Sequence, residues 1–154
     1  MPDEKIEAIL DIARRFPSAG DTQPQEFILV RDPDIKEALG EAALEQMFVA
    51  EAPVVIVTVS DTKRSAGRYG RRGVDFYSVI DGAFVSLLVL LASVDQELGA
   101  AFVGAFDDDA VREVLGLPEH VRPIGIIPIG YCAEEPMRVP RRSIDEIVHR
   151  ERYG

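Results

Sequence analysis

The chain has 154 residues, of which 47% are hydrophobic, and its formal net charge is −10. This length fits a single domain over residues 1–154 whose core needs no disulfide or metal for stability, and the acidic balance argues against a general nucleic-acid binder. One cysteine, two histidines far apart in sequence and no secretory signal pattern exclude an internal disulfide and paired zinc-ligand spacing, so we expect a cytoplasmic protein with no metal site.

Hydrophobic periodicity predicts helices and strands that alternate along the chain. Helical spacing covers residues 4–16, 33–51 and 107–115, and a last helix is expected after Ser143. Strands are predicted at residues 27–30, 54–59, 100–103 and 124–131. The run at 54–59 is continuously apolar or β-branched, which is typical of a strand covered on both faces. This alternation favours an α+β or α/β layer arrangement.

Residues 76–98 are apolar nearly all round and predict a central buried helix. Asp81, Gly82 and Asp95 interrupt this segment before an apolar run reaches about 18 residues, so we predict no membrane span.

Basic residues gather in two places. Residues 63–72 hold five basic side chains and no acid, and Arg138, Arg141 and Arg142 cluster near the end of the chain. Such patches in an acidic chain point to small anions, although charge pattern alone also fits solvated surface loops.

The familiar nucleotide and hydrolase signatures are absent from the sequence. The glycines at 67, 70 and 73 have the wrong spacing for a dinucleotide fingerprint, and no Walker-type loop or nucleophile elbow is present. If the protein performs redox chemistry, a bound organic cofactor must therefore carry the electrons.

Four segments resemble the nitroreductase family, in the same order and at similar spacing. The first is residues 17–24, where small side chains would let the backbone approach a flat ring, although an ordinary helix-ending turn is the alternative. The second is residues 46–53, the third is residues 69–83, and the fourth runs from Phe102 to Tyr131 and closes with Arg141 and Arg142. Asp21 departs from the asparagine usual in the family and lacks the amide's donor.

The resemblance implies a nitroreductase-like α+β fold, with a mixed central β-sheet flanked by helices, in an interlocked homodimer. It implies an FMN-dependent oxidoreductase that moves hydride from NADH or NADPH through flavin N5 to a nitroaromatic, quinone or flavin. Donor and acceptor would use the same site in turn, in ping-pong order, and no side chain would be an obligatory acid or base. The implied cofactor-binding residues are Pro17, Ser18, Ala19, Gly20, Asp21, Gln23, Gln46, Val103, Gly104, Ala105, Arg141 and Arg142. Among them Gln46 would reach the ring, the backbone near Gly104 and Ala105 would face N5, and the two arginines would bind the phosphate.

The resemblance also leaves alternatives open. We expect residues 63–77 to form a loop whose Arg68, Arg71 and Arg72 attract nicotinamide phosphates, or else a solvated loop. The family's usual arginine-rich N-terminal helix has no counterpart here, so we expect the natural start to lie upstream. The competing function is a flavin- or ligand-binding module without efficient turnover, and other flavin chemistry on the same scaffold also fits.

Overall fold

The computed structural model describes residues 1–134, 137 and 139–153. Its centre is a four-stranded sheet with the order β1-β2-β4-β3. The strands are β1 (Gln25–Val30), β2 (Val54–Asp61), β3 (Gly99–Ala100) and β4 (Val121–Gly130). The α+β class is therefore confirmed.

Every pairing between the described strands is antiparallel, whereas the resemblance implied a mixed sheet. The order of the strands explains this difference, because β4 lies between β2 and β3 and runs antiparallel to both. Val30 at the end of β1 pairs with Val55 near the start of β2, and Asp61 at the end of β2 pairs with Val121 at the start of β4.

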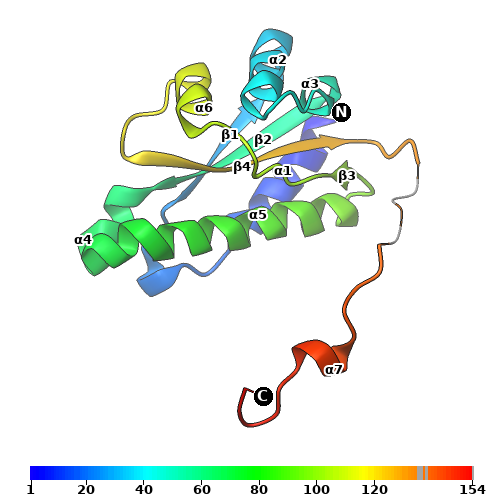
Figure 1. Ribbon diagram of the computed structural model, residues 1–154. Coiled ribbons are helices and arrows are strands. Elements are labelled where there is room, and N and C mark those ends of the chain that lie inside the picture. The colour runs from blue at the N-terminus through cyan, green and yellow to red at the C-terminus, as the bar shows by residue number, and fades with distance from the viewer. Residues whose placement is uncertain (135–136, 138, 154) are drawn as a thin grey trace.

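Helices cover both faces of the sheet (Figure 1). One face carries α1 (Asp3–Ala13) and α5 (Ser78–Asp95), and the other carries α2 (Pro33–Ala42), α3 (Phe48–Glu51) and α6 (Asp108–Leu115). Alternate residues of β2 enter the two cores: Val54 and Ile56 pack on the α5 side, and Val55 and Val57 on the α2 side. This confirms the prediction that both faces of this strand are covered.

The predicted helix over residues 33–51 is two helices. Asp32 caps α2 by accepting hydrogen bonds from the backbone N–H groups of Asp34 and Ile35. The helix ends at Ala42 because Leu44 and Glu45 are left-handed, with φ of 57° and 61°, and α3 starts only at Phe48. The apolar periodicity continues through Ala43 and Met47, so it gives no sign of the break between the two helices.

Residues 63–77, expected to form a loop, are helical. They form α4 (Thr62–Arg72) and the π-helical segment η2 (Gly73–Tyr77), which leads directly into α5. Gly70 has a φ of 54°, which bends the backbone, and a Cβ on Gly73 would lie 2.3 Å from the carbonyl oxygen of Ser65. The two glycines thus permit a tight helical bend in a sequence whose composition is typical of a loop.

Helix α5 is buried along only one face. Val85 and Val89 are fully buried against the sheet, whereas Phe84, Leu87, Leu91 and Val94 form an exposed apolar stripe, with exposed fractions of 50%, 50%, 58% and 69%. The prediction of a wholly buried helix is therefore wrong for a single copy. Among the described residues, Thr62–Asp95 is the one helical stretch long and apolar enough to cross a membrane, but its packing on the sheet is that of a core helix.

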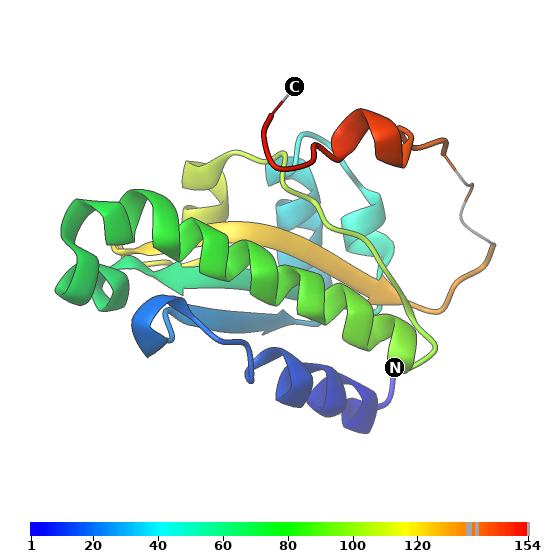
Figure 2. The ribbon, with the colours of Figure 1, turned by 90° about the horizontal axis from the view of Figure 1, so that it is seen from below.

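The C-terminal arm (residues 131–153, of which 135, 136 and 138 lie outside the described part) leaves the sheet after β4 (Figures 1 and 2). It carries the single turn α7 (Ile144–Ile147), which confirms the helix predicted after Ser143. A capping box between Ser143 and Glu146 begins this turn. Ile144, Ile147 and Val148 are all at least half exposed. The arm thus presents apolar side chains that its own domain does not cover.

Candidate functional site

The small-residue loop (residues 17–23) lies beside the start of α5. The N–H of Ala19 donates to both carboxylate oxygens of Asp81, each at 3.1 Å. Within the loop, the N–H of Gln23 donates to Ser18 Oγ at 2.7 Å, and Gln23 Nε2 donates to Asp21 Oδ1 at 2.9 Å. The Asp21 carboxylate therefore has a partner inside the loop.

Residues 103–105 follow the edge of β4. Val103 exchanges two backbone hydrogen bonds with Ile126, at 2.9 and 3.0 Å. The N–H groups of Gly104 and Ala105 donate no hydrogen bond to any described residue, and both residues are exposed. Two strong donors therefore stand free at this edge.

The side chain of Gln46 lies beside residues 103–105. Its Nε2 donates to the carbonyl oxygen of Ala105 at 3.2 Å and to that of Ala43 at 2.7 Å. The break between α2 and α3 places this side chain, because the chain turns there toward residues 103–105. The side-chain oxygen of Gln46 is left to accept another hydrogen bond.

The three arginines of the predicted anion-binding segment all have neighbours of their own. Arg68 Nη1 donates to the carbonyl oxygen of Gly20 at 2.8 Å. Arg71 pairs with Asp75 at 3.0 Å, although its side chain is 93% exposed, and the Arg72 guanidinium lies 4.5 Å from the ring centre of Phe76. Arg68 thus belongs to the small-residue loop, while Arg71 and Arg72 face solvent.

Arg141 and Arg142 lie on the C-terminal arm and are exposed. Arg141 donates to the carbonyl oxygen of Val139 at 2.9 Å, and Arg142 to that of Glu146 at 2.7 Å. Within one copy, no described contact joins either arginine to the small-residue loop or to residues 103–105. The third basic residue of this cluster, Arg138, lies outside the described residues.

Asp81 is the residue that the sequence reasoning missed. It is only 3% exposed, and burial raises the pKa of its carboxyl group above the ordinary value, against the lowering effect of the Ala19 hydrogen bond. The available signal was an acidic residue near the start of an apolar helix, which the sequence analysis took only as an interruption of the apolar run. Its role depends on contact with a loop 62 residues away, and periodicity carries no such information.

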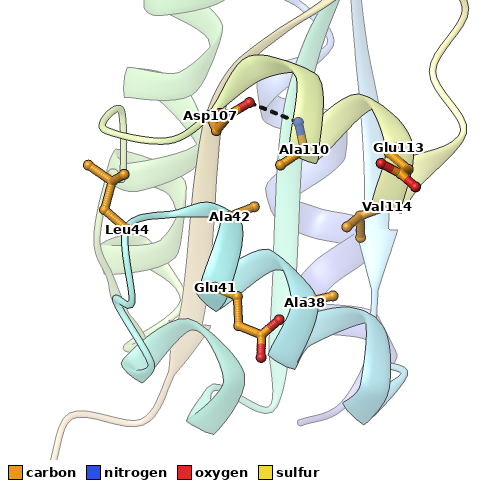
Figure 3. A pocket seen from close by; sticks show the side chains of 8 residues that line it. All are labelled: Ala38, Glu41, Ala42, Leu44, Asp107, Ala110, Glu113 and Val114. Atoms are coloured by element: carbon orange, nitrogen blue, oxygen red, sulfur yellow. Dashed lines mark hydrogen bonds between the residues drawn. The ribbon is translucent and has the colours of Figure 1, made fainter.

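Two hollows in the surface lie away from these residues. One, of about 540 Å³, lies between α2 and α6, with alanines on its walls and Glu41 and Glu113 beside them (Figure 3). The other, of about 740 Å³, lies where α5 and β4 end, next to Tyr131 and Cys132. Neither of these hollows includes a predicted cofactor-binding residue.

Comparison with known proteins places this arrangement in a family. The sequence profile of the nitroreductase family matches residues 1–68 and 48–131. The chain belongs to the nitroreductase family.

Named relatives and solved structures agree with this assignment. The nitroreductase chain is 32% identical to the NADH dehydrogenase of Thermus thermophilus, in an alignment that covers 96% of this chain and 85% of the relative. It is 27% identical to the FMN reductase [NAD(P)H] of Bacillus subtilis, over 97% of this chain and 66% of the relative. The structure of a nitroreductase family protein from Streptococcus pneumoniae superimposes with a TM-score of 0.83 at 26% identity, covering 97% and 90% of the two chains. The nitroreductase fold implied by the sequence is therefore confirmed.

Proposed function

We propose that this chain is an FMN-dependent oxidoreductase that takes electrons from NADH or NADPH and passes them to a small electron-poor acceptor, such as a nitroaromatic, a quinone or a flavin. Membership of the nitroreductase family supports the reaction class, and the relative named FMN reductase [NAD(P)H] supports the cofactor and the donor. When bound, FMN supplies hydride transfer through its N5 atom, first from the nicotinamide and then to the acceptor, in ping-pong order.

The residues present fit a flavin. The observation that carries this fit is the pair of unbonded N–H groups at Gly104 and Ala105, which can donate to the ring edge. The side-chain oxygen of Gln46 stands beside them and can accept from the ring. The side chain of Ala19 is small enough for the loop backbone to approach a flat ring closely. This chain then binds and orients the flavin, and we assign no side chain as an acid or base.

We further propose that the site is completed by a second copy of the chain. The apolar stripe on α5 and the uncovered apolar residues of the C-terminal arm are surfaces that association would remove from water. The arm would also carry Arg141 and Arg142 across to the partner's flavin phosphate, where guanidinium groups form paired charge-assisted hydrogen bonds. The second copy would then help to enclose the flavin in a site between the two chains.

Arg71 and Arg72 remain the candidates for attracting the nicotinamide phosphates. Both are on the solvent side of α4, and the pairing of Arg71 with exposed Asp75 is a weak surface contact that a phosphate can replace. A cytoplasmic location without membrane or nucleic-acid partners remains a prediction from sequence.

The proposed function can be tested by FMN binding and by the visible absorbance of the bound flavin. We expect the purified protein to bind added FMN, and anaerobic NADH or NADPH to bleach the visible flavin absorbance, which a quinone or nitroaromatic then restores. Bound flavin that neither nucleotide bleaches would reject the enzyme and support a flavin-binding module, the competing reading. Failure to bind FMN at all, in the dimeric protein, would reject the cofactor.

A further inference from the structure

The small-residue loop has a backbone that is unfavourable for its sequence. Gly20, Asp21 and Gln23 all have left-handed backbones, with φ of 56°, 56° and 47°. Glycine adopts this region freely and aspartate tolerates it, but glutamine does not favour it. Such a conformation persists only where surrounding contacts hold it.

One of these contacts comes from the core side of the loop. Asp81 projects from the first turn of α5, is almost completely buried, and accepts the Ala19 N–H through both oxygens at 3.1 Å. Burial of a carboxylate costs free energy, as the raised pKa of Asp81 reflects. A packed apolar residue would avoid this cost but could not accept the hydrogen bond.

The other contacts come from α4. Arg68 donates to the Gly20 carbonyl at 2.8 Å, and Arg64 Nε donates to the Thr22 carbonyl at 3.0 Å. Packing here is close, because a Cβ on Gly20 would lie 2.3 Å from the Tyr69 hydroxyl oxygen and 2.7 Å from Arg68 Nε. The loop is therefore held on its N–H side by α5 and on its carbonyl side by α4.

We propose that Asp81 and Arg68 are positioning residues that hold the small-residue loop in the shape that receives the flavin ring. The inference rests on the proposed function for the ligand. The hydrogen bonds of Asp81 and Arg68 to the loop, which we call the clamp, are already present in the flavin-free chain. It also gives Arg68 a role in place of the nicotinamide contact expected from sequence, since its guanidinium is already bonded to the loop.

The clamp predicts distinct effects for two substitutions at one position. Asp81→Asn keeps an oxygen that can accept from Ala19, whereas Asp81→Leu has a side chain branched in the same way and no acceptor. In flavin-free protein, we expect amide hydrogen exchange over residues 19–23 to accelerate at least about tenfold in Asp81→Leu and much less in Asp81→Asn. The reason is that the free energy lost with a hydrogen bond to a charged group corresponds to a tenfold change or more in the equilibrium for opening the loop. Affinities for FMN and riboflavin should fall by the same factor, because the loop would contact the ring and not the phosphate.

Arg68→Ala provides a second, independent test, because its side chain is on the surface and its loss leaves the core intact. Its matched control is Arg71→Ala, which removes an arginine from the same helix that does not contact the loop. We expect faster exchange over residues 19–23 in Arg68→Ala alone. Unchanged exchange in Arg68→Ala, or equal acceleration across the whole domain in Asp81→Leu, would overturn the proposal. If exchange changes as expected but no variant or wild type binds flavin, the clamp stands and the proposed function fails.

Discussion

Replacement of Leu91 by aspartate should dissociate the proposed dimer. Leu91 lies in the apolar stripe of α5 and is 58% exposed. Full burial of a leucine contributes roughly 1.5–3 kcal/mol, so burial of the exposed part would contribute about 1 kcal/mol per copy, or about 2 kcal/mol for a symmetric pair. Two buried aspartates would add a desolvation penalty of several kcal/mol. A total of about 5 kcal/mol or more raises the dissociation constant at least roughly a thousandfold.

Sedimentation velocity over a dilution series measures this directly, with flavin absorbance followed at the same boundary. The matched control is Leu44→Asp, because Leu44 is 67% exposed on the opposite side of the sheet and its φ of 57° suits aspartate. We expect the wild type and Leu44→Asp to sediment as dimers with flavin, and Leu91→Asp as a monomer without it. A Leu91→Asp protein that still sediments as a flavin-bound dimer would refute the assignment of this stripe to the interface.

Two further predictions concern charged groups. Joint replacement of Arg141 and Arg142 by alanine should weaken FMN binding by several kcal/mol and leave riboflavin binding nearly unchanged, because only FMN has a phosphate that can lose charge-assisted contacts. Fluorescence titration measures both affinities, and equal losses for the two ligands would contradict a phosphate role. The pKa of Asp81 is raised in the folded chain, so between its unfolded and folded values the folded chain binds more protons than the unfolded chain. The free energy of unfolding should therefore fall as pH rises through that window from about 4, and Asp81→Asn should lack this contribution. Urea denaturation of both proteins across this range measures it, and parallel pH profiles would show that the carboxyl group is not perturbed.

The sequence predicted those elements whose signal is local. The β2 strand was evident because a strand covered on both faces has an unbroken β-branched run, and α6 because helical spacing covers residues 107–115. The structure adds that Asp107 caps α6 and that Gly116 ends it. The bend through Gly70 and Gly73 was not predicted, since its cause is the close approach of Gly73 to the Ser65 backbone. Glycine spacing alone cannot distinguish such a packed bend from a loop.

Some features of the candidate site could also be predicted from the sequence, and others could not. The resemblance brought Gln46 and Ala105 to attention, and the structure joins them by a hydrogen bond. The basic patch at residues 63–72 also predicted that Arg68 attracts nicotinamide phosphates. That role stays a prediction, and in the structure the guanidinium donates to the carbonyl oxygen of Gly20. Sequence could predict the loop as a place for close backbone approach to a ligand, but not the side chains that hold the loop, because those lie on helices distant in sequence.

We assign the two faces of helix α5 two separate roles, which are to hold the small-residue loop and to form the interface with a second copy. Variants on the two faces can separate these roles. Its inner face holds the small-residue loop through Asp81, and its outer face carries the stripe that includes Leu91. If the loop is shaped within one copy and the site is closed by a second, the two faces act independently before flavin binds. Flavin-free Leu91→Asp should then be monomeric with wild-type amide protection over residues 19–23, and flavin-free Asp81→Leu should be dimeric with that protection lost. Loss of loop protection in monomeric Leu91→Asp would instead mean that the partner copy, and not the clamp of α4 and α5, holds the loop in its left-handed conformation.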